Sequence, residues 1–259
     1  MRAVRTIPLL ATALLALAGV ARAAPAQTLK VGTEGVYAPF TFQDADGKLT
    51  GYDVEVVREI ARRAGLEPVF APTPWDSIFL GLDSRKFDLV ANQIGKTPER
   101  EKKYLFTDDY LVSGAQIIVK EGRAGTFSGL ESLAGLKVGT GVGSNYSKLL
   151  EAYNASHTPP IDIKYYDGTL TTVLQDIVAG RLDATVNDRL TVGYNVKKLA
   201  LPVKLVGAPL ALVPSHFVVR KGPEGEALVK RLDAAIAAAK RDGTLAKLSV
   251  KWFGADYTR

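Results

Sequence analysis

Apolar and polar positions follow two periods along this chain, and the same order of periods occurs twice. LKVGT at Leu29–Thr33 begins one strand, and the same five residues at Leu136–Thr140 begin another. Apolar residues spaced three and four apart predict helices over Tyr52–Ala64 and Leu170–Ala179, each followed by a glycine. Two strand–helix–strand series in the same order predict two similar α/β lobes.

Shorter patterns complete both series. FTFQDADGKLTGYD predicts a hairpin that turns at Asp44–Gly47. Its DADG cluster has too few ligand positions for a calcium-binding loop, so a plain turn is the better interpretation. Further strands are predicted at PVFA and IDIKYY and after Asp88 and Asp183, and further helices at Trp75–Leu82, about Asn145–Ala155, Glu224–Asp242 and Leu245–Trp252.

The two lobes are not simply consecutive. AQIIVK leads out of the first series and HFVVR out of the second, and the two closing helices have no counterpart in the first series. A chain that enters the second lobe near residue 120 and returns near residue 210 accounts for both facts. We therefore expect a ligand cleft between two lobes joined by paired strands. The expected parts are lobe 1 (27–117 with 213–259), lobe 2 (121–208) and a hinge (118–120 and 209–212).

The N-terminal segment has the features of a secretory signal peptide. MRAVR is basic, IPLLATALLALAGV is apolar, and Ala21-Arg22-Ala23 is a small-x-small cleavage pattern. We expect residues 1–23 to be removed after Ala23; the alternative is a retained membrane anchor. No cysteine follows for a lipid anchor. The expectation is an exported, periplasmic protein.

Composition narrows the function classes. The chain has no cysteine and only two histidines, His157 and His216, which lie at unrelated positions. A thiolate or histidine metal site and a Ser-His-Asp triad are therefore poorly supported, and we expect no cofactor. Without residues 1–23, 30 basic and 27 acidic residues remain, and the net charge falls from +6 to +3. The basic residues are scattered, so nucleic-acid binding is not predicted.

Several stretches together resemble the extracytoplasmic solute-binding proteins that serve ABC importers of polar amino acids. They are GTEGVYAPFTF, DGKLTGYDVEV, PWDSIFLGLDSRKFDLVANQ, TPERE, KVGTGVGSNY, GRLDATVNDR and DGTLAKLSVKWFGAD. Their order and spacing are specific, and they span about residues 27–259. NQ before TPER, GSNY, NDR and KWFGAD most resemble cystine-binding members. The resemblance implies a two-lobed periplasmic binding protein fold (type II), a free amino acid as ligand and a membrane permease as partner.

The resemblance also implies how the carboxylate of an amino acid is bound. Arg100 in TPER is the expected partner, because an arginine fork gives a carboxylate two charge-assisted hydrogen bonds. The alternative is a helix-surface arginine paired with a neighbouring glutamate. The glycine-rich turn GTGVGSNY offers backbone N–H groups to an anion, and it fits neither the dinucleotide nor the phosphate-loop pattern. Ser144 and Asn145 are expected to donate from this turn, with a purely structural turn as the alternative.

The other expected contacts concern the side chain and the ammonium group. Tyr37 and Trp75 would flank the ligand side chain, although both could be plain core aromatics. Asp188 in VNDR is the expected counter-charge for the ammonium group, because a buried, unpaired ammonium is costly. The backbone carbonyl of Gln93 would assist from the other lobe. Glu34 and Asn92 are further candidates.

One departure and two alternatives stay open. At the position of Gly95 many relatives have serine or threonine, and at the position of Lys96 they have an apolar residue. The side-chain hydroxyl that helps to bind the carboxylate is therefore missing here, and only the Gly95 N–H remains. Some proteins of this fold are cyclohexadienyl dehydratases, in which Glu34 or Asp188 could act as a general acid; no second catalytic group is evident. A third possibility is that the protein delivers its ligand signal to a chemotaxis or kinase sensor, which would require a separate partner protein. We expect a monomeric binding protein and not an enzyme.

Overall fold

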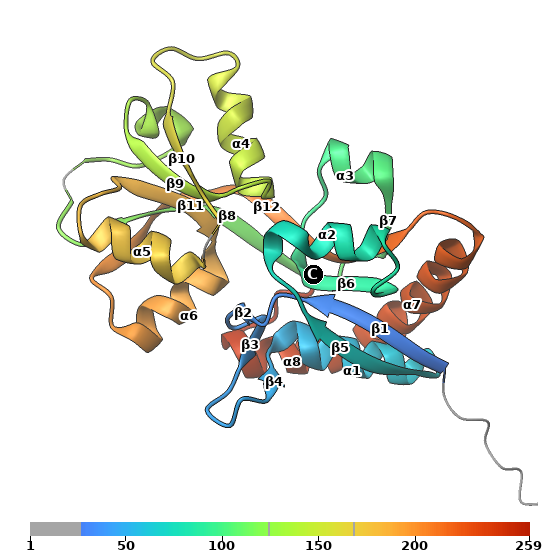
Figure 1. The fold of residues 1–259 in the computed structure, drawn as a ribbon. Coiled ribbons are helices and arrows are strands. Elements are labelled where there is room, and N and C mark those ends of the chain that lie inside the picture. The colour runs from blue at the N-terminus through green and yellow to red at the C-terminus, as the bar shows by residue number, and fades with distance from the viewer. Residues whose placement is uncertain (1–26, 124, 168) are drawn as a thin grey trace, which may run out of the picture.

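The computed structural model describes residues 27–123, 125–167 and 169–259, so the predicted signal peptide lies outside the described residues. Two α/β lobes are joined by long strands (Figure 1). The strands are β1 (Gln27–Thr33), β2 (Val36–Tyr37), β3 (Thr41–Gln43), β4 (Leu49–Thr50), β5 (Leu66–Pro72), β6 (Leu89–Ile94), β7 (Tyr104–Phe106), β8 (Leu111–Lys120), β9 (Lys137–Gly141), β10 (Asp162–Tyr166), β11 (Ala184–Asp188) and β12 (Val203–Arg220). The α-helices are α1 (Tyr52–Arg63), α2 (Trp75–Asp83), α3 (Pro98–Lys103), α4 (Asn145–Asn154), α5 (Leu170–Val178), α6 (Arg189–Leu199), α7 (Pro223–Arg241) and α8 (Thr244–Phe253), with a 3-10 turn η1 at Leu130–Leu133.

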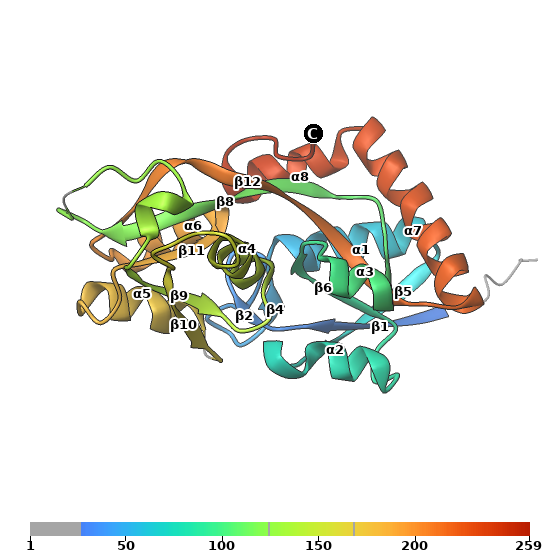
Figure 2. The ribbon, with the colours of Figure 1, turned by 90° about the horizontal axis from the view of Figure 1, so that it is seen from above.

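A single mixed sheet passes through both lobes, in the order β10-β9-β11-β8-β12-β6-β1-β5, with β7 also paired to β12. Strands β8 and β12 cross between the lobes side by side (Figure 2). Strand β12 pairs with β8 up to Ser215 and with β6 from His216 onward. The long β12 therefore belongs to both lobes, as the predicted two-lobed fold requires.

The first crossing lies earlier than the expected hinge at 118–120. Ala115–Val119 on β8 already pair with Asp188–Ala184 on β11, in the second lobe. On β12 the change of partner falls between Ser215 and His216, just after the expected 209–212. A strand that runs through both lobes carries the same apolar pattern on either side of the crossing, so the pattern does not mark the boundary.

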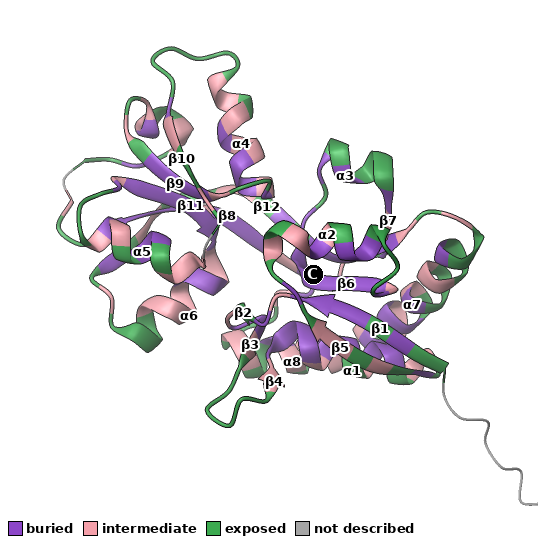
Figure 3. Cartoon of the chain, viewed as in Figure 1, coloured by how far each residue is buried: buried purple, intermediate pink, exposed green. Residues whose placement is uncertain are grey.

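Helices cover both faces of the sheet in each lobe, because successive side chains of a strand point to opposite faces. In the first lobe Val90 packs with α2, whereas Leu89 packs with α1, α7 and α8. In the second lobe Ile117 packs on the side of α4, and Ile118 on the side of α5 and α6. The buried strands and the exposed outer helix surfaces are visible in Figure 3.

Most predicted elements are confirmed within a few residues, including the hairpin and its plain turn, where Gly47 N donates to the Asp44 carbonyl. Helix α6 was missed. Val192, Val196 and Leu199 do follow a helical spacing, but Leu190, Val192, Tyr194 and Val196 also alternate as in a strand, so the apolar pattern is ambiguous. The start of the helix is set by a cap: Asp188 Oδ1 accepts hydrogen bonds from Leu190 N and Thr191 N. Among the described residues no helix is both long and apolar enough to span a membrane.

Candidate functional site

A cavity of about 80 Å³ lies between the lobes. Seven of the ten predicted site residues line it. It is smaller than the roughly 300–1,000 Å³ of ligand pockets, so an amino acid can enter only if the lobes separate or the side chains that bridge them move. The lining residues are Glu34, Tyr37, Trp75, Asn92 and Gln93 from the first lobe, and Thr140, Gly141, Ser144, Asn145, Tyr146, Tyr166, Leu170, Val173, Thr185 and Asn187 from the second.

Arg100 lies directly beside this cavity on the short helix α3. Thr97 caps α3 by accepting the Arg100 N–H, and Pro98 occupies its first turn. Arg100 is only 7% exposed, and its guanidinium carbon lies 5.3 Å from the centre of the Trp75 ring. It donates to the carbonyls of Gly95 (2.9 Å) and, across the cleft, Gly143 (3.1 Å). The helix-surface alternative does not describe this buried side chain.

Burial lowers the pKa of Arg100 to about 10. No acidic side chain of the described residues forms an ion pair with it. Its two bonded acceptors are neutral carbonyls. A buried cation is stabilised much better by an anion than by neutral carbonyls. Arg100 is therefore suited to donate hydrogen bonds to the carboxylate of a ligand.

The glycine-rich turn brings Ser144 and Asn145 to the cavity from the second lobe. Gly143 has a φ of 64°, in the region that favours glycine. The Ser144 hydroxyl accepts the Ser147 N–H at 3.0 Å and so begins α4. The turn therefore starts a helix, as the structural interpretation requires, and it also lines the cavity; its role in binding a ligand stays a prediction.

The two predicted aromatic residues bridge the lobes. Tyr37 Oη donates to Asn187 Oδ1 at 2.9 Å, and Trp75 Nε1 donates to the Val142 carbonyl at 3.0 Å. Both residues line the cavity, and the polar atom of each side chain donates to the second lobe. Neither is a plain core aromatic, and both bonds require the lobes to be close together.

Gln93 connects the first lobe to two residues of the second. Its Nε2 donates to Asp188 Oδ2 at 3.2 Å, and its Oε1 accepts from Tyr146 Oη at 3.2 Å. Asp188 is fully buried, caps α6 and does not itself line the cavity. Burial raises the pKa of Asp188 to about 6. In this closed arrangement Gln93 lines the cavity and connects it to the Asp188 carboxylate through a hydrogen bond.

Glu34 and Asn92 form a pair on the wall of the first lobe. Asn92 Nδ2 donates to Glu34 Oε2 at 3.2 Å, and its Oδ1 accepts the Glu34 N–H at 2.8 Å. Burial raises the pKa of Glu34, while the Asn92 hydrogen bond opposes that shift. Glu34 is therefore an acid that lines the cavity directly.

Gly95 lies next to the cavity without lining it. A Cβ added there would be 3.4 Å from Asn145 Cγ and from Val213 Cγ1. The Lys96 ammonium lies 5.8 Å from the centre of the Phe106 ring, outside the cavity. Lys96 therefore does not replace the absent hydroxyl in this arrangement.

Sequence reasoning missed several second-lobe residues that line the cavity. Tyr146 directly follows the predicted Asn145, and Asn187 directly precedes Asp188, so their proximity to motif residues was an available signal. The remaining residues belong to strands and to the start of α5, where the pattern alone predicts core positions. They are Thr140, Gly141, Tyr166, Leu170, Val173 and Thr185.

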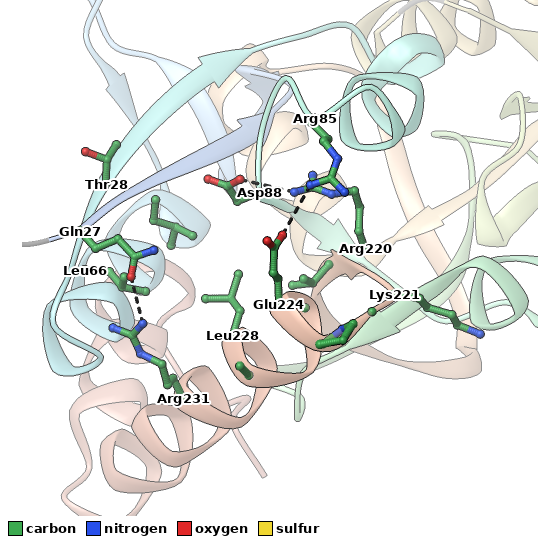
Figure 4. Close-up of a pocket in the computed structure, with 16 residues that line it drawn as sticks. Gln27, Thr28, Leu66, Arg85, Asp88, Arg220, Lys221, Glu224, Leu228 and Arg231 are labelled. Carbon is green, nitrogen blue, oxygen red and sulfur yellow. Dashed lines mark hydrogen bonds and ion pairs between the residues drawn. The ribbon is translucent and has the colours of Figure 1, made fainter.

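A larger hollow of about 810 Å³ lies on the first lobe, away from the cleft, and is open to solvent. Four of its charged side chains form ion pairs, Arg85 with Glu224 and Arg220 with Asp88 (Figure 4). Arg231 in turn donates to Gln27. No charge there is buried and unpaired as Arg100 is, so the interlobe cavity is the better candidate site.

The sequence matches the family of bacterial extracellular solute-binding proteins, family 3, over residues 29–255. The chain belongs to this family. It is 42% identical over 232 residues to the L-cystine-binding protein TcyJ of Escherichia coli strain K12, covering 90% of this chain and 85% of that protein. This relative is named as a binding protein, so the dehydratase alternative is not favoured.

Two solved structures bear on the arrangement of the lobes. An ancestral arginine-binding protein bound to arginine is 34% identical, with a TM-score of 0.80 and coverage of 89% of this chain and 100% of that one. The L-cystine solute receptor of Neisseria gonorrhoeae in the unliganded open conformation is 38% identical, with a TM-score of only 0.62 and coverage of 90% and 95%. A global score falls when two lobes are placed differently. The better match to the liganded structure agrees with the bonds that close the cleft here.

Proposed function

We propose that this protein binds a free amino acid, L-cystine in the first place, between its lobes and delivers it to the permease of an ABC importer. The observation that carries the proposal is Arg100, a buried guanidinium at the cleft with neutral acceptors only. A ligand carboxylate supplies the missing anion. Cystine is preferred over other amino acids because the relative from Escherichia coli is named for it.

The acids near the cavity suit the other end of the ligand. Glu34 lines the cavity, and Asp188 is reached through Gln93. An ammonium group would stabilise the ionised form of either carboxyl against the effect of burial. The site thus offers one cation and two acids to a zwitterion.

Closure of the lobes couples binding to transport. Tyr37, Trp75 and Arg100 on the first lobe bond to second-lobe atoms. A ligand between the lobes gains its full set of contacts only in the closed form, and so shifts the population toward it. The permease would then recognise the closed form. We propose a monomer that is exported to the periplasm after cleavage of residues 1–23.

Calorimetry tests this function on protein that has been unfolded and refolded to remove carried-over ligand. L-cystine is titrated first, followed by glutamine, histidine, arginine, glutamate and a dicarboxylate. Tight 1:1 binding of cystine is expected. Binding of another amino acid alone would correct the specificity and keep the mechanism. Absence of binding across the panel would contradict an amino-acid receptor.

A further inference from the structure

Strand β6 carries an irregularity where it reaches the cleft. Val90 pairs with Val218 and Ile94 pairs with His216, so three residues of β6 lie opposite one residue of β12. Gln93, within this bulge, has a φ of 50°, in the left-handed region that residues other than glycine seldom adopt. Bulges and left-handed residues next to a site often reorient a side chain. Here the residue concerned is the one that bonds both Asp188 and Tyr146 of the second lobe.

The backbone of Gln93 is held by a buried carboxylate from helix α1. Asp53 Oδ2 accepts the Gln93 N–H at 2.6 Å, and Asp53 Oδ1 accepts from Tyr110 Oη at 2.9 Å. Asp53 is 1% exposed. Each carboxylate oxygen thus has a donor, one of them from the bulge.

Stabilisation of its own helix does not explain Asp53. An aspartate in a first helical turn commonly satisfies free N–H groups of that turn. In α1 the Tyr52 and Asp53 N–H groups instead donate to the carbonyls of Pro39 and Phe40, and no side chain caps the helix. A buried carboxylate is costly unless it has hydrogen-bond donors. The carboxylate of Asp53 therefore supports the backbone of Gln93 and not the first turn of α1.

We propose that Asp53 is a positioning residue of the ligand site: by accepting the Gln93 N–H, it holds Gln93 in the left-handed conformation that directs it between the lobes. Asp53 does not touch the ligand. It determines where the Gln93 carbonyl and side-chain amide lie when the lobes close. This inference depends on the proposed function in one respect: L-cystine is the ligand used in the binding test.

Calorimetric titration of L-cystine into four variants tests the proposal. Asp53→Ala is expected to weaken cystine binding at least tenfold. Asp53→Asn is expected to weaken it less than threefold, because the amide keeps an acceptor for the Gln93 N–H. In a Gln93→Gly background, adding Asp53→Ala should weaken binding less than threefold, because glycine adopts positive φ without support. Equal losses in both backgrounds, or near-native affinity in folded Asp53→Ala, would overturn the proposal.

A matched control separates positioning from loss of stability. Ser249 on α8 is also fully buried in the first lobe, where it accepts the Tyr257 N–H and donates to the Ala255 carbonyl. Ser249→Ala is expected to lower the unfolding temperature without changing cystine affinity. An affinity loss in this control equal to that of Asp53→Ala would show that stability alone explains the effect.

A measurement without ligand keeps the two proposals separable. In NMR spectra of the ligand-free protein, the Gln93 amide proton should resonate well downfield and move upfield in Asp53→Asn, which has an uncharged acceptor. An unchanged resonance would overturn the positioning role, even if Asp53→Ala failed to fold. Failure of the native protein to bind cystine would instead count against the proposed ligand.

Discussion

The guanidinium of Arg100 reaches across the cleft to the backbone oxygen of Gly143 at 3.1 Å. A cation of the first lobe is thereby covered by the glycine-rich turn of the second. A carboxylate that entered between them would replace a neutral acceptor with an anion. It would also have the N–H groups of the turn nearby, so one contact of the closed form identifies where the ligand carboxylate is expected.

Arg100→Ala is expected to weaken binding of the cognate amino acid about 100-fold or more, because hydrogen bonds to charged groups contribute about 1.5–3 kcal/mol each and the fork makes two. Arg100→Lys should recover only part of the loss, since an ammonium lacks the planar fork. Calorimetry measures both variants. The circular dichroism spectrum should stay native, because the guanidinium forms no ion pair among the described residues. Near-native affinity in Arg100→Ala would remove it from the site.

Binding should weaken as the pH falls below about 6. Burial raises the pKa of Asp188 to about 6, so below that value the carboxyl is mostly protonated in the unliganded protein. An ammonium ligand favours the ionised form, so binding must then release a proton, and this group alone lowers the affinity by at most about tenfold per pH unit. Glu34, whose pKa is also raised by burial, would add to the effect.

Titrations at pH 5 and pH 7.5, in buffers of different ionisation enthalpy, measure both the affinity and the protons released. Asp188→Asn should flatten the profile, although Glu34 leaves a residual slope. Equal affinity at both pH values in the native protein would contradict a role for these acids in binding an ammonium group.

Tyr194→Ala should weaken ligand binding about three- to tenfold without any loss of ligand contact. Tyr194 on α6 lies 6.0 Å from the Phe42 ring of the first lobe, and the Lys198 ammonium lies 5.2 Å from that ring. Asn195 also donates to the Ala38 carbonyl at 3.1 Å. An aromatic pair contributes about 0.5–1.5 kcal/mol beyond burial, and a contact made only in the closed form adds that energy to binding.

Tyr165→Ala is the matched control for Tyr194. Tyr165 is an exposed tyrosine of the second lobe, and its hydroxyl donates to Glu151 of the same lobe. Its removal should leave affinity unchanged. Small-angle scattering of unliganded Tyr194→Ala should show a larger radius of gyration than native protein. If both variants bind alike, the contact with Phe42 does not contribute to closure.

Gly95→Ser should strengthen binding of an amino acid about fivefold. A Cβ at this position meets its neighbours at 3.4 Å, close to ordinary contact distance, and the hydroxyl can donate to the ligand carboxylate. A net hydrogen bond contributes about 1 kcal/mol. Calorimetry with the same ligand, against Gly95→Ala as control for the added carbon, measures the effect. Weaker binding in both variants would show that the site needs the space beside Asn145 and Val213.

Local pattern and motif chemistry determined the α/β class, the two similar lobes and most of the elements. Helix α1 runs over Tyr52–Arg63 against a predicted Tyr52–Ala64, because apolar spacing and a following glycine are local signals. Arg100, Trp75 and Ser144 were found from motifs whose order along the chain resembles one family. These features depend on residues close together in the sequence, so they could be derived without the fold.

Tertiary structure alone decided where the two lobes join and which groups form hydrogen bonds with the site residues. The crossing on β8 lies inside a continuous apolar strand, so no local change marks it. Asp188 is a helix cap that meets Gln93 from 95 positions away, and Asp53 meets the same residue from 40 positions away. Such contacts depend on the register of β6 and its bulge and on the closure of two lobes. These contacts are stabilised by packing between segments that are distant in the sequence. The spacing of residues within one segment carries no information about that packing.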